Sequence, residues 1–296
     1  MSDAAYPPAR PASGIVLMLC AVGCFAASDT LGKILVADYP ALQLLWVRNC
    51  VHVLFIVLLG WPILGRSLFR ANNVRWQWQR GLLLLLCSFL ALTSLRFMPV
   101  AEFTAIIFIS PLIMTLLAAR WLKERVSGAR WCAVGAGFAG VLLIIRPGSG
   151  LFGWAALIPL VLSGLSAFFA ILTRKYARED DALTTLFYTG LVGALASSLT
   201  IPFVWRNPPP GDWPALLALG VIAAAGHYMF VLAFRRAPAS TLSPFSYAQL
   251  IFAVLFGYVV LQAVPDQWSM LGIGVVVASG LAAAILHRWE GPHGRH

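Results

Sequence analysis

The sequence predicts an all-α integral membrane protein with ten transmembrane helices in two inverted five-helix repeats. Hydrophobic residues make up 60% of the 296 residues and charged residues only 11%, and the mean hydropathy is +0.84. This composition leaves too little polar surface to cover a soluble domain. The second observation is an internal repeat: the RFMP of Arg96–Pro99 recurs in the second half of the chain as the RRAP of Arg235–Pro238, again between two long apolar runs.

Ten apolar segments follow one another along the chain. A transmembrane helix needs roughly 20 apolar residues. The third and fifth segments are shorter, but arginines flank both, and their long side chains can reach the membrane interface. Ten of the eleven tryptophans lie near segment ends, as in an interfacial aromatic belt, and Trp46 is the exception. The segments lie near residues 14–36, 41–62, 81–97, 101–120, 131–146, 153–173, 182–204, 213–234, 239–262 and 268–287.

The spacing that aligns Arg96 with Arg235, which we call the repeat offset, holds over nearly the whole chain. It also aligns Gly14 with Gly153 and Gly81 with Gly220. Each copy contains five segments. A unit with an odd number of crossings ends on the opposite side of the membrane from its start, so the second copy must be inverted. Inverted repeats are typical of secondary transporters. We predict one repeat in residues 1–148 and the other in residues 149–296.

The net charge of +10 is distributed by loop rather than gathered in one patch, which argues against a nucleic-acid partner. When the loops are assigned alternately to the two sides, the side with both termini holds sixteen Lys and Arg residues. The other side holds four, namely Lys33, Arg96, Arg146 and Arg206. By the positive-inside rule both termini are cytoplasmic. We expect a multi-pass protein of the bacterial inner membrane without a cleavable signal.

Several classes of function have no support in the sequence. The longest loop, Gly65–Arg80, carries no Gly-rich phosphate loop, so this chain is not expected to use ATP. No HExxH pair, Gly-x-Ser-x-Gly elbow or paired intramembrane aspartates indicate an enzyme. We expect no metal site and no cofactor. The cysteines show no paired spacing and are predicted to be packing residues: Cys20, Cys24, Cys50, Cys87 and Cys132.

Four stretches of sequence carry a family resemblance. The first segment contains FAASDTLGK at 25–33 and the second opens with PALQLLWVR at 40–48; LRFMPVAEFTAIIFISPLIMTLLA at 95–118 and WLKERVSGARWCAVGAGFAGVLLIIRPG at 121–148 follow. These stretches resemble the drug/metabolite transporter superfamily, specifically its EamA type. The resemblance covers essentially the whole chain. It implies ten helices in two inverted repeats and ATP-independent movement of metabolites such as amino acids, nucleobases, vitamins, sulfonium compounds and drugs.

Five ionisable residues are predicted to gather in the outer third of the first repeat. A charge near the bilayer centre costs about 2.5 to 3.5 kcal/mol, so such residues generally have a function. Asp29 and Lys33 lie one turn apart on the first helix, Arg48 lies early in the second, Arg96 ends the third and Glu102 begins the fourth. We predict that they form a salt-bridge network, an outer gate; the alternative is a solvated rim of loop charges. Equivalent positions in the second copy hold basic residues but no acid, which predicts an inner gate closed by bulk or neutral hydrogen bonds.

A substrate site is expected near the bilayer midplane, between the repeats. Ser88 and His227 match at the repeat offset, and His227 is interpreted as lining the cavity, with an interhelical hydrogen bond as the alternative. His52 is interpreted as structural. The predicted substrate-binding residues are His227, Tyr228, Tyr247, Gln249, Ser88 and Ser110.

Small residues four apart predict close helix packing on the fifth and tenth segments. The pairs are Gly135 with Ala139 and Gly274 with Ala278. They are expected to pack against each other or across a dimer, so the protein is predicted to be a monomer or a homodimer.

The sequence therefore predicts a secondary, ATP-independent transporter that moves small amphipathic metabolites by alternating access. Amino acids and their derivatives are the leading substrate class. The alternative within the transporters is an importer of S-adenosylmethionine-like or flavin-like compounds. A membrane enzyme or a receptor-like protein in the same bundle is less favoured. The expected partners are a small-molecule substrate and the lipid bilayer, and export and import are both open.

Overall fold

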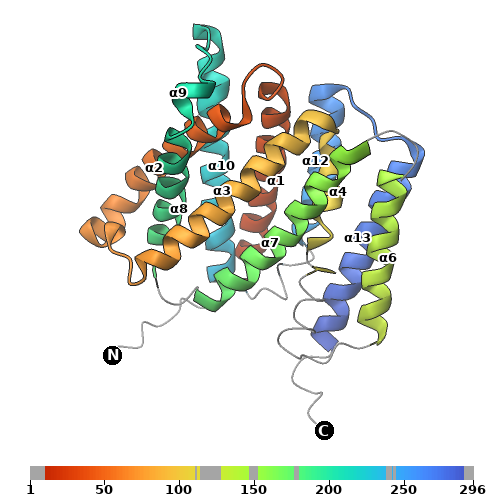
Figure 1. The fold of residues 1–296 in the computed structure, drawn as a ribbon. Helices are drawn as coiled ribbons and strands as arrows, with labels where there is room; N and C mark the ends of the chain where they lie inside the picture. Colours follow the sequence, from red (N-terminus) through yellow and green to blue (C-terminus); the bar gives the residue numbers. More distant parts are fainter. Residues whose placement is uncertain are drawn as a thin grey trace.

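The computed structural model describes residues 11–110, 112–113, 128–146, 153–176, 180–237, 242 and 245–289, and every regular element in this part of the chain is a helix (Figure 1). The all-α fold class is thus confirmed. The first half contains α1 (Pro11–Leu35), α2 (Ala41–Leu64), the 3-10 helix η1 (Gly65–Phe69), α3 (Val74–Phe97), α4 (Val100–Ile107) and α6 (Gly128–Ile145). The second half contains η2 (Gly153–Ala156), α7 (Leu157–Tyr176), α8 (Ala182–Ser198), α9 (Ile201–Val204), η3 (Pro210–Asp212), α10 (Trp213–Arg236), α12 (Ala248–Leu261) and α13 (Gln267–Trp289).

The third helix is longer than its apolar run predicts. Four stretches of the described chain are long and apolar enough to cross a membrane, namely Ala12–Leu35, Ala41–Phe69, Val74–Phe97 and Pro210–Phe234. The third of them begins well before the predicted segment, which starts at Gly81. The reason is its N-cap: the Asn73 side chain accepts a hydrogen bond of 3.1 Å from the Trp76 amide and starts the helix in polar sequence. The basic and amide side chains between Val74 and Arg80 therefore belong to α3 rather than to the preceding loop.

Two central helices are interrupted at positions that the repeat makes equivalent. The predicted fourth segment begins as α4, which stops at Ile107, and the chain turns at Phe108 and Ile109. The predicted ninth segment is interrupted by a turn at Tyr247, after which α12 begins. The repeat offset places Phe108 on Tyr247. Discontinuous helices at matching positions of two repeats are where transporters build their substrate sites.

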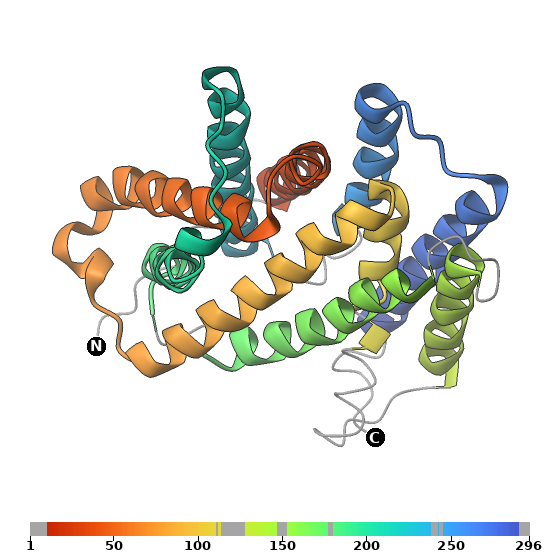
Figure 2. The ribbon, with the colours of Figure 1, turned by 45° about the horizontal axis from the view of Figure 1, so that its top comes forward.

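The helices pack in pairs that the repeat relates to each other. α3 packs against α7 and α8, and α10 packs against α1 and α2; Figure 2 shows α3 and α7 running side by side through the middle of the bundle. A Cβ at Gly81 of α3 would lie 2.7 Å from Val192 of α8, and a Cβ at Gly220 of α10 would lie 2.5 Å from Val51 of α2. These glycines match at the repeat offset, so one close helix contact is made twice.

The α6–α13 pair lies at one side of the bundle, and the α2–α8 pair lies at the opposite side (Figure 1). α6 and α13 approach closely because Gly140 and Gly272 face each other: a Cβ at Gly272 would lie 2.6 Å from the Gly140 carbonyl oxygen. A Cβ at Gly135 or Gly274 would meet nothing within 4 Å. The prediction that these two glycines pack the helices together is therefore wrong, because they lie on another face of the helices. The dimer alternative for them stays a prediction.

Apolar side chains fill the interior and also cover the outside. Residues 100–106 of α4 are all buried, which makes α4 the central helix. Large apolar side chains such as Leu58, Phe203 and Ile251 are 66%, 87% and 70% exposed, an arrangement suited to contact with lipid. All five cysteines are free thiols; Cys87 is buried, as expected of a packing residue, whereas Cys20 and Cys132 are exposed.

At one end of the bundle, a loop region of the first repeat is hydrogen-bonded to a loop of the second repeat. We call this end the outer end, after the predicted topology. Gln43 and the Arg206 backbone exchange hydrogen bonds of 2.7 and 2.8 Å, and the Arg206 guanidinium donates to the Asp38 carbonyl at 2.9 Å. The Tyr39 hydroxyl donates to the Asp212 carboxylate at 2.5 Å. This hydrogen bond raises the pKa of Tyr39 to about 12, with burial and the charge of Asp212 adding to the shift.

Candidate functional site

A cavity of about 200 Å³ lies where α4 and α12 are interrupted. At about 30 Å³ for each water, it has room for a small metabolite or a head group, although cavities for drug-sized ligands run to about 300–1,000 Å³. Its lining comes from α1, the α4 region, α7 and α12, so both repeats contribute. The lining residues are Asp29, Phe103, Thr104, Ile107, Phe108, Ser110, Ser166 and Gln249.

Two pairs of repeat-equivalent positions meet at the cavity. Ser110 and Gln249 match at the repeat offset, as do Phe108 and Tyr247. The Phe108 and Tyr247 rings are in contact, with centroids 4.9 Å apart and planes inclined by 43°. A site at the interface of inverted repeats can be reached in turn from either side when the repeats exchange conformations.

Two polar groups in the cavity wall have unused hydrogen-bonding capacity. Thr104 Oγ1 is buried and has no hydrogen-bond partner, although a threonine in a helix commonly donates to a carbonyl one turn back. The Gln249 amide donates to Asp29 Oδ2 over 3.5 Å, which is a long contact. Buried polar groups are generally satisfied, so the cavity is suited to a ligand with polar atoms.

Asp29 is partly buried, and its carboxylate faces the cavity. The N-terminus of α12 lies nearby, because Gln249 in the first turn of that helix contacts Asp29. Lys33 lies one turn away on the same helix. Within the described residues, Asp29 forms no ion pair at 4.0 Å or less with Lys33 or Arg48.

Arg48 forms a second polar centre beside the first. It projects from α2, and its Nη2 donates to the buried Ser88 Oγ on α3 at 2.7 Å. Arg48 and Asp29 are near enough to interact electrostatically. His52 and His227 also lie within the electrostatic range of Arg48. The site therefore has an acidic end at Asp29 and a basic end at Arg48.

The two histidines bridge helices. His52 is buried, and its Nε2 lies 3.2 Å from the Leu186 carbonyl oxygen of α8, which agrees with the structural interpretation. The His227 ring contacts Phe25, with centroids 4.9 Å apart, and lies 6.0 Å from the His52 ring. His227 is partly buried and is not part of the wall of the cavity at Asp29.

The structure brings together only part of the predicted substrate site. Ser110 and Gln249 line the cavity, and Ser88 is held by Arg48. Tyr247 lies behind Phe108 and is itself buried, whereas Tyr228 packs in an apolar cluster with α2 and α8. Sequence reasoning missed Phe103, Thr104, Ile107, Phe108 and Ser166 and placed Asp29 in the gate alone. The repeat offset, which pairs Phe108 with Tyr247, was the available signal for Phe108.

The five predicted gate residues do not form ion pairs with one another in the described structure. Lys33 and Arg48 are partly buried, Arg96 is exposed, and Glu102 is buried near the outer end of α4. Glu102 Oε2 has no hydrogen-bond partner. In the conformation described, these residues therefore range from buried to exposed and do not form one network.

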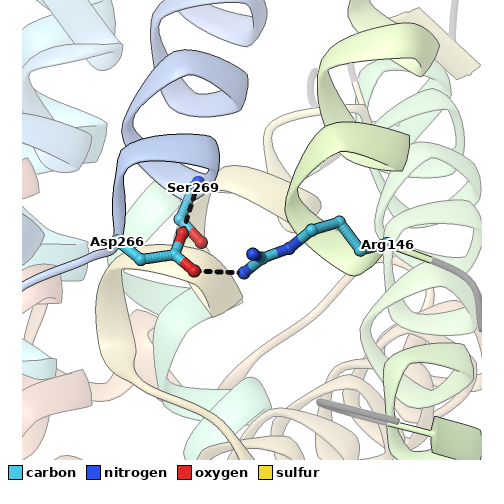
Figure 3. A network of polar contacts seen from close by, with 3 residues as sticks. All are labelled: Arg146, Asp266 and Ser269. Carbon is cyan, nitrogen blue, oxygen red and sulfur yellow. Dashed lines mark hydrogen bonds and ion pairs between the residues drawn. The ribbon is translucent and has the colours of Figure 1, made fainter. Parts of the chain in front are cut away.

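An ion pair that the sequence did not reveal closes the outer end of α6 onto α13 (Figure 3). Arg146 Nη2 lies 2.5 Å from Asp266 Oδ2, and the Ser269 amide donates to Asp266 Oδ1 at 2.7 Å. The Ser269 amide and then Arg146 hold the pKa of Asp266 below its ordinary value. Glu102 lies close enough to interact electrostatically with both partners. Because Arg146 and Asp266 belong to different repeats, loop charges alone could not predict the pair.

The opposite, inner end contains hydrogen bonds from α3 to α8 and to Asp180, which precedes α8. Arg80 Nη1 donates to Thr189 Oγ1 at 2.6 Å, and the Arg80 guanidinium lies over the Phe169 ring, 5.0 Å from its centroid. Gln77 Nε2 donates to Asp180 at 2.7 Å. Thr189 is the approximate counterpart of Arg48 in the second repeat, so the two ends use different chemistry at this position.

Comparison with known proteins covers nearly the whole chain. A sequence model described as the EamA-like transporter family matches residues 12–146 and again 153–284. A riboflavin transporter of Vibrio cholerae is 27% identical over 95% of both chains. An S-adenosylmethionine uptake transporter of Rickettsia conorii is 25% identical over 91% of both chains. The pseudopaline exporter CntI of Pseudomonas aeruginosa is 26% identical over 91% of this chain and 95% of its own.

A crystal structure of a protein with 20% sequence identity has the same fold. The TM-score is 0.65, and the match covers 95% of this chain and 97% of the other. The fold of nearly the whole chain is therefore one already seen in a solved structure.

Proposed function

Because the chain belongs to the EamA-like transporter family, and is thus a multi-pass membrane protein that transports a small molecule, we propose that it carries amino acids and their derivatives without ATP. The substrate would bind in the cavity at the interrupted helices, and the two repeats would expose that cavity to each side in turn. The family and the named relatives are transporters rather than enzymes.

One observation carries the proposal. The cavity lies between two helix interruptions that the repeat makes equivalent, and its wall holds an unpartnered hydroxyl at Thr104 as well as the carboxylate of Asp29. Phe103, Ile107 and Phe108 supply an apolar side to the same wall. Such a wall suits an amphipathic molecule with a polar head and an apolar body.

The second candidate function is import of an S-adenosylmethionine-like or flavin-like compound. The relatives from Rickettsia conorii and Vibrio cholerae are named for S-adenosylmethionine and riboflavin, and an aromatic pair borders the cavity. A flat ring system would need more room than about 200 Å³. The cavity would therefore have to extend towards α3 and α10, where Ser88, His227 and Tyr228 lie. These residues and Tyr247 stay proposed substrate contacts.

We retain the outer gate as part of the proposal. Asp29, Lys33, Arg48, Arg96 and Glu102 would form ion pairs in a conformation with the outer end closed, and they are apart in the conformation described. In that case Asp29→Asn should lower transport. It should also raise the rate at which an impermeant thiol reagent, applied from outside, labels a cysteine placed at Ser110. Unchanged labelling together with unchanged transport would remove Asp29 from the gate.

Transport is tested by uptake of labelled compounds into proteoliposomes that contain the purified chain and no nucleotide. The panel contains amino acids, S-adenosylmethionine and riboflavin. Saturable accumulation of a chemically unchanged compound supports the proposal. Chemical conversion of the compound would instead identify an enzyme, and binding without accumulation would identify a receptor-like protein. Light scattering of the purified protein in detergent distinguishes a monomer from a homodimer.

A further inference from the structure

An acidic and a basic side chain lie within the bundle near one another and are not paired with each other. Asp29 comes from α1 and lines the cavity, whereas Arg48 comes from α2, lies outside the cavity wall and donates to Ser88. They interact electrostatically but lie beyond the 4.0 Å limit of an ion pair. An ionised group in a membrane interior is costly unless something compensates it, so a ligand with an opposite charge at each end would stabilise the ionised forms of both side chains.

The basic end has donors to spare. A guanidinium carries five N–H groups in a planar fork that matches a carboxylate. In the described structure the hydrogen bond of Arg48 is the one to the neutral hydroxyl of Ser88. His52 and His227 are the other titratable groups near it, and neither supplies a negative charge. Arg48 is therefore suited to an anionic group of a ligand.

The acidic end has acceptors to spare. Asp29 receives a single long contact from Gln249, whereas an ionised carboxylate can accept about four hydrogen bonds. Two neutral oxygen atoms, those of the Ser110 and Thr104 side chains, belong to the same wall. A compact ammonium group with three donors would find acceptors from all three residues.

We propose that Arg48 and Asp29 together bind the head group of a zwitterionic substrate, with the carboxylate at Arg48 and the ammonium group at Asp29. The inference rests on the proposed transport function and adds the chemical class of the head group. The apolar wall of Phe103, Ile107 and Phe108 takes the body of the molecule. When the ligand leaves, Asp29 and Arg48 regain an attraction for each other, which favours closure of the empty site.

The test measures binding of matched ligands to the purified full-length protein in detergent. S-adenosylmethionine carries both head-group charges, its decarboxylated form lacks only the carboxylate, and methylthioadenosine lacks both the amino-acid group and the sulfonium charge. Riboflavin is the ligand without such a head group. We expect S-adenosylmethionine to bind about 10- to 100-fold more tightly than its decarboxylated form, the range expected for a hydrogen bond to a charged group.

Two variants locate the recognition. Arg48→Gln should reduce the affinity for S-adenosylmethionine about 10- to 100-fold and abolish its advantage over the decarboxylated form, whereas Arg48→Lys should retain part of that advantage. Asp29→Asn should weaken binding of both amine-bearing compounds and leave methylthioadenosine unchanged. The matched controls are Arg66→Gln and Asp38→Asn, which make the same chemical changes at exposed positions and should leave every affinity unchanged.

The outcomes separate the inference from the proposed function. Equal binding of S-adenosylmethionine and methylthioadenosine, or an advantage that Arg48→Gln preserves, would overturn the zwitterion site. Binding and uptake of riboflavin alone would do the same while leaving the transport function intact. If no amino-acid-bearing compound of the uptake panel binds to folded protein, the inference is wrong. The melting temperature of each variant shows whether the protein is folded.

Discussion

Replacing Gly280 with alanine is expected to push the Tyr247 ring towards Phe108 and the cavity. A Cβ at Gly280 would lie 1.8 Å from the Tyr247 hydroxyl oxygen, 2.0 Å from Cζ and 2.4 Å from Cε1. Ordinary contact begins near 3.4 Å, so the ring must move by more than an ångström. Tyr247 is buried and already touches Phe108, and the movement is therefore passed to the cavity wall.

The magnitude follows from the same contacts. Overpacking of a filled interior costs about 1 to 3 kcal/mol, and the higher helix propensity of alanine returns about 0.5 to 1 kcal/mol. We expect Gly280→Ala to lower the melting temperature in detergent and to weaken substrate binding. Gly274→Ala is the matched control on the same helix, because its Cβ would meet nothing within 4 Å. If the two variants have the same melting temperature and affinity, the reasoning from Tyr247 to the cavity is refuted.

Three further predictions concern the repeat, the outer ion pair and the topology. Gly220→Ala should destabilise the protein by about 1 to 3 kcal/mol, since its Cβ would lie 2.5 Å from Val51, and a melting temperature equal to that of the parent would contradict the packing. The pKa of Asp266 is lowered in the folded protein. Its pair with Arg146 therefore stabilises the folded state at pH values above the ordinary aspartate pKa of about 4. This stability is lost as the pH falls through the lower pKa of the folded protein. The melting temperatures of the parent and Asp266→Asn should accordingly differ at pH 7 and converge at acidic pH, whereas a constant difference would exclude this linkage. In a background without cysteine, an impermeant thiol reagent applied to intact cells should label Gly211→Cys but not Ser67→Cys, and the reverse pattern would invert the topology.

Much of the fold could be predicted from the sequence. Apolar runs are a local signal, and the internal repeat is found by comparing the sequence with itself. Both can be recognised in one sequence, so the helical class and the equivalence of Gly81 and Gly220 could be predicted. The early start of α3 depended on a single side-chain cap at Asn73, which hydrophobicity does not report. Hydrophobicity does not report the interruption at Phe108 either, because the segment is apolar on both sides of the turn.

The candidate site could be predicted only in part. Ser110 and Gln249 were found because polar residues are rare at that depth, and both line the cavity. Which helix face a residue occupies depends on tertiary packing, and this is why Tyr228 lies in an apolar cluster and Asp29 in the cavity wall. The pairing of Arg146 with Asp266 joins chain segments from different repeats, and no local pattern in a single sequence marks such a contact.

The most direct test of the central claim compares uptake by two glutamine variants in proteoliposomes. The claim is that an unmodified small molecule crosses the membrane through the cavity at the equivalent interruptions of α4 and α12. Gln249 lines that cavity, whereas Gln79 is exposed on α3 and serves as the control. We predict that the parent protein and Gln79→Ala accumulate the same unchanged compound at the same rate without nucleotide, and that Gln249→Ala is slower by about 10-fold or more. Uptake by Gln249→Ala at the parent rate, or recovery of a chemically altered compound, would contradict the account.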